Sequence, residues 1–201
     1  MSNIQSLESK IRDYVNSHNL YKNKYYKDNP DKWNMLCVSM DTLGDTCQAL
    51  LDFESKGIEG DFGEKYLRLY GFLQAIFIQQ DAIRYLCESF LQFSLELESL
   101  YEKLRSPSSY LKNWDTIREL RNLTAGHPIE MKRDKIVKRC FITRVSISSH
   151  GFILLIYNAN ENKVEFKNID LQKVYSGYKG ETTSILEEIL NDLGSRESYN
   201  D

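Results

Sequence analysis

The sequence predicts an α+β fold that is mainly helical: an antiparallel helical bundle, then a small three-stranded antiparallel β-meander and a C-terminal helix. Through the first two-thirds of the chain, apolar residues recur every three or four positions, which is the period of helices that bury one face. After Pro128 the period changes to two, which is typical of strands. A last apolar stripe near the C-terminus, preceded by a capping signal, predicts the final helix.

Two amphipathic helices are predicted before Gly60. The first covers roughly Ile4–Lys27 and places its apolar side chains on one side. The second begins at Asn29-Pro30, because asparagine is a good N-cap and proline suits the first helical position. Its apolar stripe ends near Gly57, where a glycine allows the chain to leave the helix.

The most apolar helix of the chain is predicted to follow, from about Phe62 to Phe93. Asp61 and Glu64 have the spacing of a capping box at its start. Because this helix is apolar almost all round, we expect it at the centre of the bundle or in a subunit interface. A fourth helix is predicted over about Tyr110–Ala125, with Gly126 as its stop.

Three strands with a period of two are predicted after the bundle. They cover Val137–Ile147, Phe152–Tyr157 and Lys163–Lys167. The polar segments Ser148–Gly151 and Asn158–Asn162 have the composition of turns. Short turns between successive strands predict an antiparallel meander.

The final helix is predicted to begin at Ser184, which forms a capping box with Glu187, and to end at Gly194. We therefore expect two closely packed parts. Residues 1–130 form the helical bundle, and residues 131–201 form the meander and the last helix, packed on the bundle.

The cysteines are predicted to be reduced thiols in a cytoplasmic protein. They form no C-x-x-C pair, and three of the four lie on apolar faces of predicted helices. The histidines are far from any cysteine pair, so we expect no metal and no cofactor. The cysteines are Cys37, Cys47, Cys87 and Cys140.

No membrane-spanning segment is predicted. The most apolar run, Leu67 to Ile78, is interrupted by Arg68, Gly71 and Gln74 and is too polar to span a bilayer. The N-terminus lacks the apolar core of a signal peptide. We therefore expect a soluble protein with no membrane partner.

The segment from Arg121 to His127 brings together a cation, an amide and an imidazole. His127 can transfer a proton to or from a ribose oxygen, and Arg121 can bind a phosphate while negative charge builds on it. Asn122 can orient either group. Six residues of ideal helix turn by about 600°, so the two ends would not share a face. We expect Gly126 to end the helix in a left-handed conformation, which returns His127 toward Arg121.

This Arg-Asn-x-x-x-x-His arrangement at the end of a bundle helix resembles the signature of the HEPN superfamily (higher eukaryotes and prokaryotes nucleotide-binding domains). Many members are metal-independent endoribonucleases in toxin–antitoxin, abortive-infection and CRISPR systems. The resemblance covers about Trp33 to Pro128, and Arg121, Asn122 and His127 match the motif. It implies that these three residues are catalytic.

The resemblance also implies a homodimer in which two Arg–His pairs meet in one cleft. Single-stranded RNA would be cleaved to a 2′,3′-cyclic phosphate and a 5′-hydroxyl. An antitoxin or another partner protein is a further expectation from the defence context of such enzymes.

Polar residues that interrupt the apolar third helix need a hydrogen-bond partner or solvent. We expect Gln80 or Asp81 to lie beside Arg121 and support it. The alternative is a local ion pair between Asp81 and Arg84, which are three residues apart on one helix face.

The chain carries 26 Lys and Arg against 29 Asp and Glu, a net charge of −3, so RNA binding requires a local basic patch. From Met131 to Arg144 there are six basic residues and one acidic residue. These cations either follow the RNA backbone or guard an exposed edge strand against aggregation. The predicted RNA-binding residues are Lys132, Arg133, Lys135, Lys138 and Arg139.

Three other roles fit the sequence. In a non-catalytic HEPN-like module that dimerises, assembles with a partner or binds a nucleotide, Arg121 is held in an intramolecular pair and His127 is buried. In a purely structural role, Arg121 pairs with Glu119, Asp115 or a helix C-terminal carbonyl while His127 caps the helix end. In a small-molecule carrier, the apolar third helix lines a pocket near Phe72 and Phe77.

Overall fold

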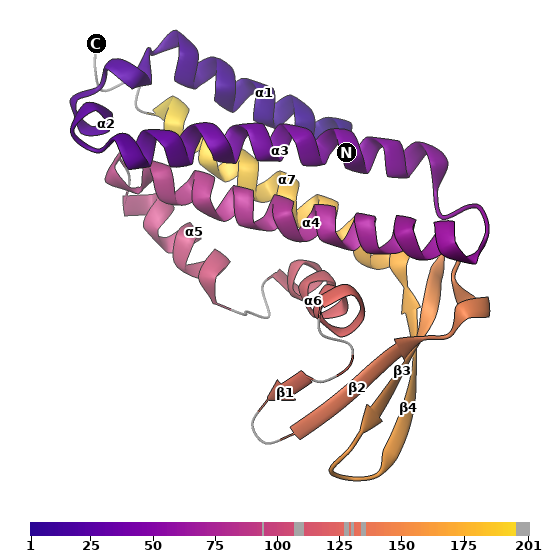
Figure 1. The fold of residues 1–201 in the computed structure, drawn as a ribbon. Coiled ribbons are helices and arrows are strands. Elements are labelled where there is room, and N and C mark those ends of the chain that lie inside the picture. Colours follow the sequence, from indigo (N-terminus) through magenta and orange to yellow (C-terminus); the bar gives the residue numbers. More distant parts are fainter. Residues whose placement is uncertain (94, 107–110, 127–128, 130, 134–135, 196–201) are drawn as a thin grey trace.

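Long helices lie side by side in a bundle, and an antiparallel sheet projects from the end of the bundle where α4 begins (Figure 1). The structure, a computed structural model, describes residues 1–93, 95–106, 111–126, 129, 131–133 and 136–195. The predicted fold class is confirmed: the chain is mainly helical, with an antiparallel meander followed by a C-terminal helix.

The helices come first and last in the chain, and the strands lie between them. In order, the elements are α1 (Ser2–Ser17), η1 (Leu20–Lys22), α2 (Lys24–Asp28), α3 (Pro30–Lys56), α4 (Phe62–Phe90), η2 (Leu91–Phe93), α5 (Leu95–Arg105), α6 (Lys112–Arg121), the π-helix η4 (Asn122–Gly126), β1 (Met131–Arg133), β2 (Ile136–Ile142), η5 (Arg144–Ser146), β3 (Gly151–Asn158), β4 (Lys163–Asp170) and α7 (Leu171–Ser195).

The first predicted helix is broken into three pieces. The prediction of one helix over Ile4–Lys27 is wrong, because α1 ends at Ser17 and Asn19 adopts a left-handed conformation with φ of 49°. Asparagine tolerates this conformation better than most residues, since its short side chain can hydrogen-bond locally. The chain then turns through η1 and α2 before α3 begins.

The start of α4 is as predicted, whereas the start of α3 differs in detail. At α4, the Glu64 amide donates to Asp61 Oδ1 (3.0 Å) and the Asp61 amide donates to Glu64 Oε2 (2.9 Å), which completes the capping box. At α3, the Asn29 side chain does not cap the helix and instead donates to the Tyr25 carbonyl (2.9 Å). Asn29 occupies the predicted cap position, but the prediction that its side chain caps the helix is wrong.

Helix α4 occupies the middle of the bundle, in contact with α3, α5 and α6. Its buried Phe72 stacks on Phe53 with ring centroids 4.0 Å apart and meets Tyr175 edge-on. These contacts fill the space that a carrier would need beside Phe72. None of the described helices combines enough length with enough apolar character to span a bilayer.

The sheet has the order β1-β2-β3-β4, with each strand antiparallel to the next. The meander formed by β2, β3 and β4 confirms the prediction, and the short strand β1 adds to it. β2 ends at Ile142 instead of Ile147, because η5 turns the chain at Arg144–Ser146. Alternate residues of β2 and β3 are buried toward the bundle, including Cys140, Ile142, Leu154 and Ile156.

The last helix begins much earlier than predicted. Helix α7 starts at Leu171, and the Asp170 side chain accepts a hydrogen bond from the Lys173 amide (2.9 Å). The predicted capping box at Ser184 is wrong, because Ser184 lies inside the helix and its hydroxyl donates to the Gly180 carbonyl (3.2 Å). Helix α7 packs against α1 and α6, so the chain returns from the sheet into the bundle (Figure 1).

The cysteines are free thiols, as predicted for this chain. Cys47, Cys87 and Cys140 are buried, and Cys37 is half-buried. Burial raises the pKa of Cys47 and of Cys87 to about 12. A thiol with such a pKa stays protonated at neutral pH and is a poor nucleophile.

A three-residue cluster ties α3, α4 and α5 together. Glu88 accepts hydrogen bonds from Lys32 Nζ (2.8 Å) and from the Tyr101 hydroxyl (2.7 Å). Burial acts to raise the pKa of Glu88, but these two hydrogen bonds outweigh it and lower the pKa below its ordinary value. The cluster therefore contributes stability above the ordinary carboxyl pKa of about 4.3 and loses it as the pH falls through the lowered pKa.

We expect Glu88→Gln to lower the free energy of unfolding by about 1 kcal/mol at pH 7, because the bonds to a charged acceptor are lost. The difference from wild type should shrink in acid and disappear once Glu88 is protonated in the folded protein. Urea titrations at pH 7, 5 and 3 measure this. Glu102→Gln is the control, since Glu102 forms an exposed pair with Arg105 (3.3 Å). A difference from wild type that does not depend on pH would contradict the assignment.

Candidate functional site

The predicted motif lies where α6 changes into a π-helix. Arg121 is the last residue of α6, and Asn122 is the first residue of η4. The left-handed conformation predicted for Gly126 is wrong, because the described glycines with positive φ are Gly57, Gly60 and Gly151. The chain instead continues in wider turns, which occur mostly as short π-segments and often at functional sites.

Gly126 lies directly beneath the Arg121 side chain. A Cβ atom at Gly126 would be 2.8 Å from Arg121 Nη1 and 3.4 Å from Cζ. Residues five apart stack in a π-helix, so the widened turn brings this glycine under the arginine. The guanidinium therefore lies beside the residue that precedes His127. His127 and Pro128 themselves are outside the described residues.

Neutral groups hold the Arg121 guanidinium. Its Nε donates to Gln74 Oε1 (3.0 Å), and its Nη1 donates to Asn122 Oδ1 (3.1 Å). Its Cζ is 4.3 Å from the centroid of the Phe77 ring. Within the described part of the chain, Arg121 has no ion pair with Asp115, Glu119 or another carboxylate. The side chain is thus oriented by amides while its positive charge stays uncompensated.

Gln80 and Asp81 contact Arg118 instead of Arg121. Arg118 Nη2 lies 2.9 Å from Asp81 Oδ1, and Nη1 donates to Gln80 Oε1 (3.4 Å). The prediction that Gln80 and Asp81 lie beside Arg121 is therefore wrong. Later residues of α6 contact earlier residues of α4. Arg121 therefore contacts Gln74, which precedes Asp81 on α4 by nearly two turns.

Arg118 and Arg121 lie on one face of α6 but differ in whether a carboxylate pairs with their charge. Arg118 is paired with Asp81, which also lies 3.5 Å from Arg84, as the alternative interpretation of the sequence predicted. Arg121 has only amide partners. Both guanidinium groups lie over the Phe77 ring, at 4.4 Å and 4.3 Å from its centroid. Of the two, Arg121 is the cation that can bind an added anion without first breaking an ion pair.

Gln74, Phe77 and Arg118 were not predicted from the sequence to lie at this site. Their signal is spacing: Gln74, Phe77 and Asp81 recur at three and four residues on α4, and Arg118 precedes Arg121 by three on α6. Polar residues at such positions on an otherwise apolar helix indicate that they face a polar neighbour.

Only part of the predicted RNA-binding basic patch lies within the residues that the structure describes. Lys135 and the side chains of Lys132 and Arg133 lie outside the described residues. Lys138 is half-buried and Arg139 is exposed on β2. Because successive residues of a strand point to opposite faces, these two cations do not form one continuous stripe.

No group of three or more metal-ligating side chains occurs among the residues that the structure describes. The chain matches no protein-family model, no curated protein and no solved structure.

We expect Gly126→Ala to reduce any activity that depends on Arg121 by about tenfold, because the new methyl group displaces the guanidinium from Gln74 and Asn122. The arginine end is flexible, so the free energy of unfolding should change by less than about 1 kcal/mol. Initial rates of RNA cleavage and urea titrations measure the two effects.

Gly180→Ala is the matched control, because a Cβ atom there meets nothing within 4 Å in the middle of α7. This variant should keep the full activity and should gain a little stability from better helix propensity. Equal rates for the two alanine variants would show that the Arg121 position over Gly126 has no functional role.

Proposed function

We propose that this chain is a metal-independent endoribonuclease of the HEPN type that cleaves single-stranded RNA, in a defence or toxin–antitoxin context. The observation that carries the proposal is the state of Arg121: a guanidinium oriented by two amide oxygens, free of any described carboxylate, beside the residue that precedes His127. In this role Arg121 binds the phosphate, His127 transfers protons, and Asn122 positions Arg121.

The reaction is an internal transesterification. The ribose 2′-oxygen loses its proton to an imidazole and attacks the adjacent phosphorus. The bond from phosphorus to the 5′-oxygen breaks, and that oxygen takes a proton from an imidazolium. The products are a 2′,3′-cyclic phosphate and a 5′-hydroxyl, and no water is consumed.

Each group has a physical reason for its place. An imidazole titrates near neutrality and contributes on the order of 10²–10⁴-fold as a general base or acid. A guanidinium forms forked hydrogen bonds to phosphate oxygens and stabilises the charge that grows on them. The Asn122 Oδ1 bond to Arg121 Nη1 fixes the orientation of that fork before substrate arrives.

One imidazole cannot be both base and acid in the same turnover step. We therefore include a homodimer in the proposal, in which two copies bring their motifs into one cleft and supply one histidine for each proton transfer. A partner protein such as an antitoxin would then regulate the enzyme by covering this cleft.

Cleavage of single-stranded RNA in EDTA by wild type and by His127→Ala tests the proposal. We expect loss of at least 100-fold in the variant, in line with the contribution of a general acid or base. His150→Ala is the control, because His150 is an exposed turn residue remote in sequence from the motif. Equal cleavage by wild type and His127→Ala would defeat the enzyme claim. A nucleotide that raises the melting temperature without being cleaved would favour the binding-only alternative.

A further inference from the structure

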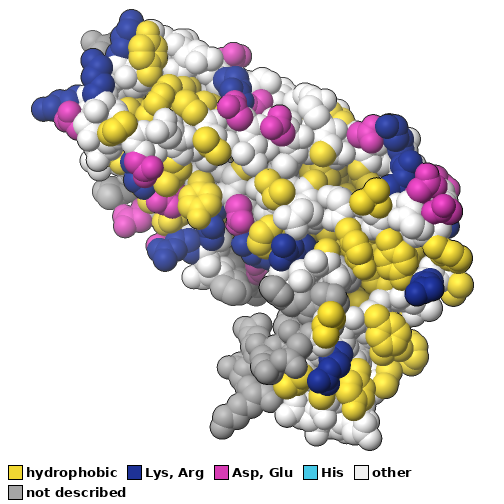
Figure 2. Space-filling view, in the orientation of Figure 1, with side chains coloured by type: hydrophobic (Ala, Val, Ile, Leu, Met, Phe, Trp, Pro, Cys, Tyr) yellow, Lys and Arg dark blue, Asp and Glu magenta, His cyan; other side chains and the backbone are white. Residues whose placement is uncertain are grey.

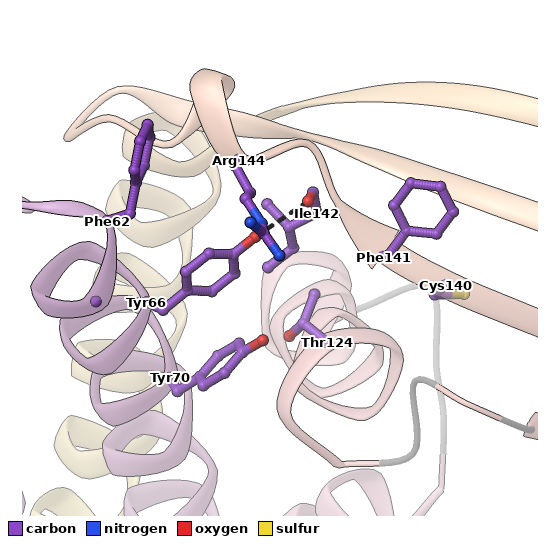
Figure 3. Close-up of a pocket in the computed structure, with 9 residues that line it drawn as sticks. Phe62, Tyr66, Tyr70, Thr124, Cys140, Phe141, Ile142 and Arg144 are labelled. Carbon is purple, nitrogen blue, oxygen red and sulfur yellow. Dashed lines mark hydrogen bonds between the residues drawn. The ribbon is translucent and has the colours of Figure 1, made fainter.

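A groove of about 560 Å³ lies between the start of α4, the π-helix η4 and strand β2. Figure 2 shows hydrophobic side chains gathered where the start of α4 meets the sheet, with Lys or Arg side chains among them. Four aromatic rings line the groove. In Figure 3, Tyr66 and Tyr70 extend side by side from α4 toward β2, and Phe62 and Phe141 lie at opposite ends. The lining residues are Phe62, Gly63, Tyr66, Tyr70, Thr124, Cys140, Phe141, Ile142 and Arg144.

Two of the four aromatic rings of the groove are largely open to solvent. Phe62 is 56% exposed and Phe141 is 57% exposed, although both are fully apolar. Tyr66 is held in place, because its hydroxyl donates to the Ile142 carbonyl (3.2 Å) and so links α4 to β2. Exposed rings that lie together along a groove are typical of a binding surface.

The polar groups of the groove favour an anion with a planar ring. Arg144 is exposed, projects into the groove beside Tyr66 in Figure 3, and has no carboxylate partner among the described residues. Among the residues that the structure describes, no aspartate or glutamate lines the groove. The hydroxyls of Tyr70 and Thr124 face each other across it (Figure 3), and the Thr124 hydroxyl already donates to the Leu120 carbonyl (2.7 Å). Its oxygen is left as an acceptor.

The groove adjoins the motif along the chain. Thr124 lies in η4, two residues after Asn122 and two before Gly126. A chain that placed one phosphate at Arg121 could therefore reach the groove with a neighbouring nucleotide.

We propose that this groove binds a nucleobase of single-stranded RNA, with the base stacked among the aromatic rings and a flanking phosphate on Arg144. The inference rests on the proposed function and names where that enzyme holds its substrate. Stacking on aromatic side chains accepts any base, so the groove supplies affinity without strict sequence preference. Its volume suits a nucleotide, since small-molecule sites commonly measure about 300–1,000 Å³.

Fluorescence anisotropy of a labelled oligouridylate tests the groove. Every 2′-oxygen of the oligonucleotide is methylated, so the attacking group is blocked and binding is measured without cleavage. We expect Phe141→Leu to raise the Kd about tenfold, since leucine keeps the apolar surface but cannot stack. Phe141→Trp should keep the wild-type Kd. Tyr85→Leu is the control: Tyr85 is 41% exposed on α4 and does not line the groove.

Equal Kd values for Phe141→Leu and Tyr85→Leu would overturn the groove assignment, as would equal binding of an abasic ribose–phosphate chain. Melting temperatures of all variants verify that they are folded. Cleavage of unmodified RNA in EDTA separates the two proposals. If the wild-type protein cleaves RNA and Phe141→Leu changes neither KM nor Kd, the groove proposal is rejected and the nuclease proposal stands. Binding that depends on Phe141 without any cleavage supports the groove and rejects the nuclease.

Discussion

Replacing Arg121 with alanine is expected to slow the cleavage of single-stranded RNA by about 10²–10³-fold. A positioned donor to a developing oxyanion contributes this much to catalysis, because it acts where charge appears in the transition state. Arg121 is suited to this role because its described partners, Gln74 and Asn122, are neutral. Initial rates in EDTA with saturating RNA measure the effect on the chemical step.

Arg118→Ala is the matched control for this prediction. It removes a guanidinium from the same helix and the same aromatic ring, but one that is already paired with Asp81. We expect the rate to fall by less than about fivefold. Some stability should also be lost, but the loss is limited because Asp81 would still have Arg84 as a partner. A result in which Arg118→Ala is the more damaging change would mean that the wrong arginine has been assigned.

Gln79→Ala is expected to lower the free energy of unfolding by about 3–5 kcal/mol. The side chain is fully buried in the centre of the bundle and connects three helices. Its Oε1 accepts from the Tyr178 hydroxyl (2.8 Å) of α7, and its Nε2 donates to Thr46 Oγ1 (3.2 Å) of α3. Alanine leaves a cavity and leaves the buried Tyr178 hydroxyl without its acceptor, and both effects lower stability.

Urea titration measures this loss, with Gln48→Ala as the control. Gln48 is exposed on α3, so its replacement should change the free energy by less than about 0.5 kcal/mol. Tyr178→Phe combined with Gln79→Ala should cost less than the sum of the two single changes, because the two residues share one hydrogen bond. Strict additivity would show that this bond contributes nothing.

Helices with strong local signals were predictable, and helices set by tertiary contacts were not. The Asp61–Glu64 capping box and Pro30 fixed where α4 and α3 begin. The start of α7 was missed because Gly177 and Gly180 make its first half resemble a loop. The space at Gly177 is filled by Asn113 of α6, where a Cβ atom would be only 2.3 Å from the Asn113 amide. Such a contact between distant residues leaves no periodic trace in the sequence.

The site was predictable in part for the same reason. Residue types singled out Arg121 and Asn122, which the structure brings into contact. The partner Gln74 depends on how α6 crosses α4, and one helix alone does not specify that crossing. The π-helix was also beyond prediction, because a widened turn depends on what surrounds it as well as on its residues. Gly126 was expected to reverse the chain, and it instead lies beneath the Arg121 guanidinium.

The most direct measurement is an end-group analysis of RNA incubated with the protein in EDTA. Mass spectrometry of the products from wild type should show fragments that end in a 2′,3′-cyclic phosphate and begin with a 5′-hydroxyl, and Arg121→Ala should yield almost none. Intact RNA with the folded wild-type protein, or 3′-hydroxyl and 5′-phosphate ends that persist in Arg121→Ala, would contradict the account.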